Sequence, residues 1–142
     1  MGGGENRPPF QPLKGRDWQE WFQELPTPSY ILDEGKLRAN GQVLKALQER
    51  TGCKVLLAQK AFSNFDLYGT LAPYLAGTEA SGLYEARLGR EEMPDREVHV
   101  FCGAYRQQDF GELLKYADDI VFNSPHQLPQ FGAAAKAAGN SV

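Results

Sequence analysis

The stretch Val55-Leu56-Leu57-Ala58-Gln59-Lys60-Ala61-Phe62-Ser63 joins an apolar run to a lysine. The run predicts a buried β-strand over residues 55–61, because short apolar runs bounded by polar residues are typical of strands in a sheet core. Burial disfavours the charged form of a lysine and lowers its pKa, which makes the free amine a nucleophile toward carbonyl carbon. Lys60 is therefore a candidate for covalent chemistry with an aldehyde. The alternative is a lysine with a packed stem and a solvated ammonium group.

Composition narrows the class of protein. The chain has 142 residues, enough for one domain, and a net charge of −3 without a Lys/Arg-rich run, so no nucleic-acid partner is expected. No apolar stretch approaches the ~20 residues of a membrane span, and residues 1–6 lack the apolar core of a signal peptide. Cys53 and Cys102 form no CxxC motif, which favours a reduced, cytoplasmic protein without a metal site.

A strand–helix unit recurs on the C-terminal side of the opening strand. Strand starts lie about 20 residues apart, which is the pace of βα units rather than of hairpins. The predicted strands cover residues 55–61, 78–81, 98–102 and 120–123, and the helices that follow them cover residues 65–75, 83–90, 108–117 and 125–138. Alternating strands and helices predict a parallel sheet.

Two architectures fit this alternation, an open doubly wound sheet and a (β/α)₈ barrel. A Gly-rich phosphate loop such as GxGxxG is missing from the sequence, which weakens the nucleotide-binding version of the open sheet. Each predicted strand ends near a polar or reactive residue: Lys60, Ser81, Cys102 and Asn123. Such residues gather at the carboxyl ends of barrel strands, where barrel enzymes carry their active sites. The pattern alone leaves both architectures open.

The N-terminal part is predicted to be organised differently. Residues 1–16 are rich in Gly and Pro and are expected to be a mobile extension. Asp17 and Glu20 have the spacing of a capping box, and a short amphipathic helix is expected to run from there to Leu25. Ser29–Leu32 is expected to form a short strand. Asp33 is then expected to cap a helix that ends near Thr51, with Gly52 as its stop.

Five segments together resemble the pyridoxal-phosphate decarboxylases of the alanine racemase-like barrel fold, most closely the carboxynorspermidine (carboxyspermidine) decarboxylases. The segments are Thr27–Asp33, Leu57–Ser63, Gly77–Ser81 with Glu85–Gly89, Glu97–Val100 with Ala104–Tyr105, and Tyr116–Ser124. The resemblance implies a partial (β/α)₈ TIM-type barrel of about four βα units, preceded by one strand of the family's β-domain. Residues 1–25 would then be an extension with a short helix, and residues 26–142 the N-terminal half of the barrel.

The same resemblance implies a function. Lys60 is the residue expected to hold pyridoxal 5'-phosphate, and Ser81 and Asn123 are further candidate cofactor-binding residues. As bare residues, Ser81 is equally explained as a helix cap and Asn123 as a turn residue. The implied reaction is decarboxylation of a carboxylated polyamine in polyamine biosynthesis, by an enzyme that is a homodimer at full length.

The resemblance also sets limits and alternatives. The family's phosphate loop, its acid for the pyridine nitrogen and its substrate-binding acids are expected beyond Val142, so the chain is expected to be inactive alone. Gln59 stands where the family usually has leucine, Tyr84 where histidine is expected, and Cys102-Gly103 where Ser-Pro is expected. The alternatives are a non-catalytic pyridoxal-phosphate-binding barrel protein, another decarboxylase of the fold (diaminopimelate or ornithine type), and a truncated product without activity.

Overall fold

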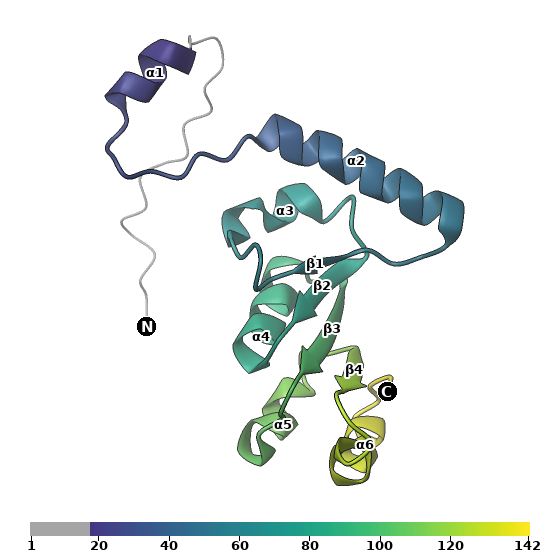
Figure 1. Ribbon diagram of the computed structural model, residues 1–142. Helices are drawn as coiled ribbons and strands as arrows, with labels where there is room; N and C mark the ends of the chain where they lie inside the picture. The colour runs from purple at the N-terminus through teal and green to yellow at the C-terminus, as the bar shows by residue number, and fades with distance from the viewer. Residues whose placement is uncertain (1–17) are drawn as a thin grey trace. The chain divides into compact units, whose positions relative to one another are not determined.

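The computed structural model describes residues 18–142, which divide into two compact units at Leu32 and Asp33 (Figure 1). The first unit contains helix α1 (Trp18–Glu24), as predicted, while the proposed cap at Asp17 and the extension before it lie outside the described residues. The strand predicted at Ser29–Leu32 is wrong. These residues pair with no other strand of the described chain, and an extended segment becomes a β-strand only through such pairing.

The second unit alternates strands and helices along the chain. In order, its elements are α2 (Glu34–Thr51), β1 (Leu56–Ala58), the 3₁₀ helix η1 (Phe65–Leu67), α3 (Tyr68–Leu71), β2 (Gly77–Ala80), α4 (Leu83–Glu92), β3 (Glu97–Cys102), α5 (Gln107–Leu113), β4 (Asp119–Phe122) and α6 (Gln127–Ala137). All four predicted strands and the helices between them are present.

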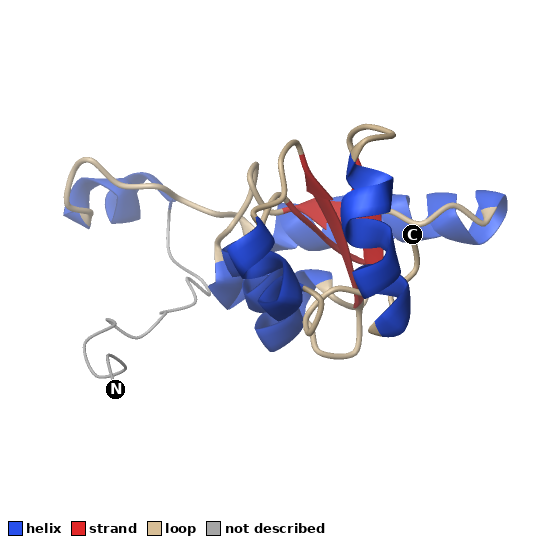
Figure 2. Ribbon diagram, turned by 90° about the horizontal axis from the view of Figure 1, so that it is seen from below, coloured by secondary structure: helices blue, strands red, loops and turns tan. Residues whose placement is uncertain are grey.

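The four strands form one parallel sheet in the order β1-β2-β3-β4, visible as a single layer in Figure 2. A doubly wound sheet reverses its strand order at a switch point, whereas a barrel adds each new strand beside the previous one. The sequential strand order therefore indicates a barrel-type sheet rather than a doubly wound one. The described strands form an open part of such a barrel and do not close it.

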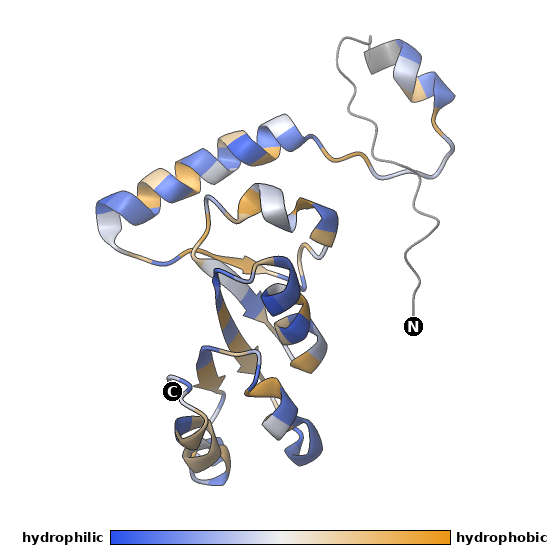
Figure 3. Ribbon diagram, turned by 180° about the vertical axis from the view of Figure 1, so that it is seen from behind, coloured by the Kyte–Doolittle hydropathy of each residue, from blue (hydrophilic) through white to orange (hydrophobic). Residues whose placement is uncertain are grey.

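The helices cover one face of this sheet. The core takes every second residue of the strands, because side chains alternate between the two faces. Its larger cluster joins β2, β3 and β4 to α4, α5 and α6 through Ala80, Ala86, Val98, Val100, Phe110, Leu113, Ala117, Ile120, Phe131 and Ala135. A second cluster around Tyr68 and Met93 receives residues of α2, whose polar and apolar positions alternate in Figure 3. Within residues 18–142, neither core cluster includes a helix on the opposite face of the sheet, which is called the helix-free face below.

Local signals explain several boundaries. The Asp33 side chain accepts a hydrogen bond from the Lys36 N–H and begins α2, and Gly52 ends it with φ at 72°, a left-handed conformation that glycine adopts without a steric penalty. Helix α3 ends at Leu71, two residues before Pro73 and short of the predicted end at residue 75, since proline cannot continue a helix. The described helices include none with the length and apolarity required to cross a membrane.

Strand β1 is shorter than predicted and ends at Ala58. The N–H groups of Ala61 and Phe62 both donate to the carbonyl oxygen of Ala58, at 3.0 and 3.2 Å, so the chain folds back just after the strand. The last ladder bond joins the N–H of Gln59 to the oxygen of Glu79, at 3.1 Å. Lys60 therefore lies in a turn at the carboxyl end of β1.

Candidate functional site at the carboxyl ends of the strands

Lys60 is exposed, and it makes no hydrogen bond or ion pair with the described residues. The expectation that its amine is taken out of water is therefore wrong for this structure. The strand ends three residues earlier than predicted, so Lys60 lies in the turn and not in the strand. Gln59 is 1% exposed and lies on the helix side, bonded to Tyr68 and Glu85, whereas the Lys60 side chain is exposed in the turn. The orientation of Lys60 toward the barrel interior stays a prediction.

Ser81 follows the neighbouring strand β2. The pairing of β1 with β2 runs from Leu56 and Gly77 to Ala58 and Glu79, so position 60 and position 81 each lie two residues beyond the last pair. The Ser81 N–H donates to Oε2 of Glu85 at 2.6 Å, so the loop after β2 is fixed to the first turn of α4. Of the predicted site residues, Lys60 and Ser81 are thus the two that lie at adjacent strand ends.

Asn123 follows β4, at the far side of the sheet, with β3 between it and Ser81. Its N–H donates to Oε1 of Gln127 at 2.7 Å, and its side-chain amide donates to the carbonyl oxygen of Gly103 at 3.4 Å. Gln127 also donates to the Gly103 oxygen, at 3.0 Å. Asn123 therefore ties the loops after β3 and β4 together, and the structure gives it no contact with Lys60 or Ser81.

Glu79 was not predicted as a site residue. It lies on β2 two residues before Ser81, on the helix-free face, and pairs in register with Ala58 of β1. Its Oε1 atom is buried and has no hydrogen-bond partner among the described residues. A buried carboxylate oxygen without a donor is costly, so this atom is open to a donor from a ligand. Glu79 precedes Ser81 by two residues, and residues two apart on a strand share a face, so the strand pattern could have indicated Glu79.

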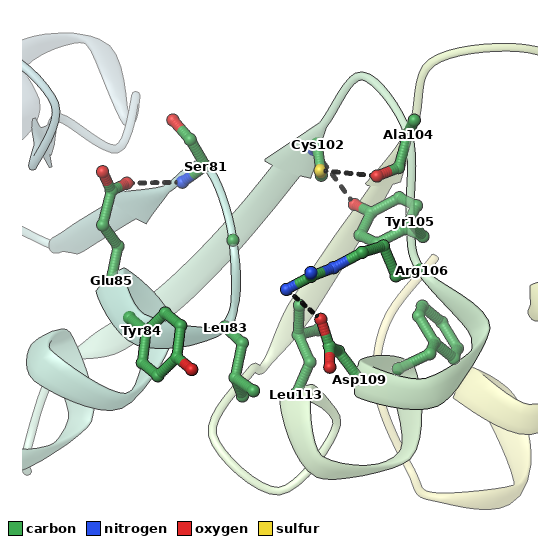
Figure 4. A pocket seen from close by; sticks show the side chains of 12 residues that line it. Ser81, Leu83, Tyr84, Glu85, Cys102, Ala104, Tyr105, Arg106, Asp109 and Leu113 are labelled. Carbon is green, nitrogen blue, oxygen red and sulfur yellow. Dashed lines mark hydrogen bonds and ion pairs between the residues drawn. The ribbon is translucent and has the colours of Figure 1, made fainter.

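A cleft of about 300 Å³ opens between the loops after β2 and β3 (Figure 4). Ser81 and Glu85 lie on one side of it, and Arg106 and Asp109, an ion pair at 2.5 Å, lie on the other. The Tyr105 hydroxyl donates to the oxygen of Val121 at 2.8 Å and so connects the ends of β3 and β4. Burial raises the pKa of Tyr105 to about 12, which keeps this donor protonated.

A charged group lies at the amino end of the same sheet face. His99 Nε2 is 2.8 Å from Oε2 of Glu97 and 3.3 Å from Oδ2 of Asp119, and Lys54 donates to Oε1 of Glu97 at 2.7 Å. Glu97, His99 and Asp119 have possible metal-ligand atoms that lie within 4.8 Å of one another. Glu97 and Asp119 begin β3 and β4, whereas His99 pairs in register with Glu79 of β2, so the cluster lies beside Glu79 on the helix-free face.

Comparisons with known proteins agree on one class. No family model matches the chain. It is 39% identical over 111 residues to a protein of Campylobacter jejuni and 35% identical over 111 residues to one of Herminiimonas arsenicoxydans, both named carboxynorspermidine/carboxyspermidine decarboxylase. It is 38% identical over 115 residues to the carboxyaminopropylagmatine decarboxylase of a Synechocystis species. These matches cover 78%, 78% and 81% of the chain.

A solved structure gives the same result. The crystal structure of carboxynorspermidine decarboxylase from Campylobacter jejuni, complexed with norspermidine, matches 79% of the chain with a TM-score of 0.75 and 38% identity. Over this region the chain is therefore similar in sequence and structure to part of a decarboxylase. Two of the three relatives are named decarboxylases of carboxynorspermidine and carboxyspermidine, the family that the sequence was predicted to resemble. The chain spans about 30% of the length of these curated relatives.

Proposed function

We propose that the chain supplies the cofactor-lysine part of a pyridoxal-phosphate-dependent decarboxylase that acts on carboxynorspermidine or carboxyspermidine in polyamine biosynthesis. The observation that carries this proposal is the place of Lys60, exposed in the turn at the carboxyl end of β1 in a barrel-type sheet. The names of the relatives support the reaction and the substrate class. The full-length enzyme is proposed to be a cytoplasmic homodimer.

The residues present fit the covalent attachment of the cofactor. The Lys60 amine is exposed and unpaired among the described residues, so an aldehyde can reach it without breaking an ion pair. Glu79 has a buried oxygen without a donor among the described residues, and Ser81, like Lys60, lies two residues beyond the last pair of β1 and β2. Pyridoxal phosphate, when bound, accepts the electron pair that is left as carbon dioxide departs.

The roles of the chain's own residues follow from their positions. Lys60 would hold the cofactor by its side-chain nitrogen. Glu79 Oε1 would accept a hydrogen bond from a protonated amine or hydroxyl on the same face, and Ser81 Oγ would donate to an anionic group. Because the resemblance assigns the phosphate loop and the acid for the ring nitrogen to residues beyond Val142, we propose that the 142-residue chain does not decarboxylate alone.

The test is site-resolved labelling. The purified chain is mixed with equimolar pyridoxal phosphate, reduced with borohydride and digested, and the adduct on each lysine is quantified by mass spectrometry. We expect Lys60 to carry most of the adduct in the parent chain. Lys60→Ala is expected to lose that adduct, and Lys45→Ala, a change at an exposed lysine of α2, is expected to retain it.

Two results would contradict the proposal. Equal labelling of Lys60 and Lys45 would mean that the amine reacts only as a surface lysine does. Total reducible cofactor that is unchanged in Lys60→Ala would place the attachment elsewhere. Release of carbon dioxide from carboxynorspermidine by the chain alone would contradict the proposed inactivity and leave the attachment site supported.

A further inference from the structure

Gln59, the residue before Lys60, is part of a buried polar network that reaches Ser81. Gln59 is 1% exposed and Tyr68 is fully buried. The Tyr68 hydroxyl donates to Oε1 of Gln59 at 3.2 Å, and Nε2 of Gln59 donates to the main-chain oxygen of Glu85 at 2.8 Å. The Glu85 carboxylate then accepts the N–H of Ser81 at 2.6 Å. Three side chains and two main-chain groups thus connect the ends of β1 and β2.

The network lies behind the proposed site. Lys60 is exposed in the turn after β1, and the side chain of the residue before it is held on the helix side, so the bonds to Gln59 fix the start of the turn that presents Lys60. Glu85 performs two tasks, because its main-chain oxygen binds Gln59 and its carboxylate binds Ser81. The lysine turn and the Ser81 loop are therefore held by one residue of α4.

Each member of the network is suited to a fixed role. Burial raises the pKa of Tyr68 to about 12, so its hydroxyl remains a donor through the neutral range. Helix α4 can approach Gln59 because residue 89 is glycine, and a Cβ there would lie 3.1 Å from Gln59 Nε2. A polar side chain at a fully buried position is stabilising only when its hydrogen bonds are made, and both ends of the Gln59 amide are bonded.

We propose that Gln59, Tyr68 and Glu85 are positioning residues that hold Lys60 and Ser81 in register at the carboxyl ends of β1 and β2. This inference rests on the proposed function of Lys60. Gln59 stands where the resembled family usually has leucine. Its hydrogen bonds would link two strand ends in place of an apolar contact.

The test uses variants that conserve volume. Gln59→Leu and Tyr68→Phe each remove the Tyr68–Gln59 bond without opening a large cavity. At temperatures where circular dichroism shows each variant folded, we expect the adduct on Lys60, relative to Lys45, to fall about fivefold, the equivalent of one hydrogen bond. Glu85→Gln keeps an oxygen for the Ser81 N–H and is expected to retain the ratio, whereas Glu85→Ala is expected to lower it.

A double variant separates positioning from stability. Gln59→Leu/Tyr68→Phe replaces both partners with apolar groups, which recovers thermal stability because no buried polar group is left unpaired on either side chain. We expect its Lys60 labelling to remain low. Recovery of labelling together with stability would show that the network only supports the fold, and would overturn the inference. Unchanged labelling in the folded single variants would overturn it as well.

Amide hydrogen exchange gives a readout that does not depend on the cofactor. The N–H groups of Ala61, Phe62 and Ser81 are expected to exchange about tenfold faster in Gln59→Leu, while the N–H of Asn123, bonded to Gln127, is unchanged. If Lys60 carries no adduct in the parent chain, the proposed function is wrong. The exchange rates of these amides then test the network by themselves. Unchanged exchange at Ala61 and Ser81 would then overturn it.

Discussion

Arg90 and Asp118 connect helix α4 to the turn before β4 through an ion pair of 2.6 Å between Nη2 and Oδ2. The same guanidinium donates to the main-chain oxygen of Tyr116, at 3.1 Å from Nη2 and 3.2 Å from Nε. Asp118 Oδ2 also accepts the N–H of Val98 at 2.7 Å, so one carboxylate binds the helix and the second residue of β3. The pair thereby joins two consecutive βα units on the side where the strands begin.

Replacement of this arginine tests the connection. Arg90→Met retains most of the stem but removes the guanidinium that donates to the Tyr116 oxygen and to the Asp118 carboxylate, which keeps only the Val98 N–H. We expect the free energy of unfolding in urea to fall by about 2 kcal/mol, since hydrogen bonds to charged groups contribute about 1.5–3 kcal/mol. Arg87→Met on the same helix removes only an exposed pair with Glu91 and is expected to cost less than ~0.5 kcal/mol. Equal losses would show that the Arg90 pair is worth no more than a surface contact.

Gly89 marks the closest approach of α4 to the sheet. A Cβ at this position would lie 2.3 Å from Oγ1 of Thr78, so the helix or the threonine must move. Overpacking of this kind costs about 1–3 kcal/mol, more than the ~1 kcal/mol that alanine gains over glycine in a helix. Gly89→Ala is therefore expected to lower the midpoint of thermal unfolding. Gly111→Ala, with nothing within 4 Å of the added Cβ, is expected to raise it, and the same sign for both would refute the steric argument.

The Thr78 hydroxyl is fully buried and makes no hydrogen bond within the described residues. Valine has nearly the same shape and removes this unpaired group, which costs about 1–3 kcal/mol when buried. We expect Thr78→Val to stabilise the chain by about 1 kcal/mol in urea unfolding. Thr70→Val provides the contrast, because the Thr70 hydroxyl donates to Oε1 of Glu34 at 2.8 Å and its loss is expected to destabilise. A destabilised Thr78→Val would mean that the hydroxyl has a partner in solution.

Local signals in the sequence were enough to predict most of the fold. The helix that begins after Asp33 and ends at Gly52 is visible in its cap residues, and the strands are visible as short apolar runs at regular intervals. The choice between a barrel-type and a doubly wound sheet was not available from these signals. It depends on which strands pair, and strand pairing joins residues about 20 positions apart along the chain.

The site was predicted less completely, for the same reason. Alternation along β1 predicted that Gln59 and Lys60 point to opposite faces, but the exposure of Lys60 depends on what covers the sheet. The contact of Gln59 with Tyr68 and Glu85 requires a strand, a turn and a helix to meet, and no short motif encodes it. The expected strand at Ser29–Leu32 needed a pairing partner that local sequence cannot supply.

Glu97 gives the chain a pH dependence with a definite sign. Its hydrogen bond with Lys54, and then that with His99, lowers the pKa of this carboxyl below the ordinary 4.5. Because the folded-state pKa is the lower one, the ionised group contributes stability above about pH 4.5, and this contribution is lost as the pH falls through the folded-state pKa. Glu97→Gln is therefore expected to have a lower thermal midpoint than the parent at pH 6.

The difference between the two midpoints is expected to shrink as the pH is lowered from 6 to 3, since the parent carboxyl also becomes neutral there. Its side chain is 37% exposed, so the difference should be small and should diminish in 1 M salt. The same comparison is made in a His99→Gln background, which removes the imidazole. The part of the midpoint difference that comes from the Lys54–Glu97 pair is expected to remain there. A midpoint difference that grows toward pH 3 would contradict the lowered pKa of Glu97.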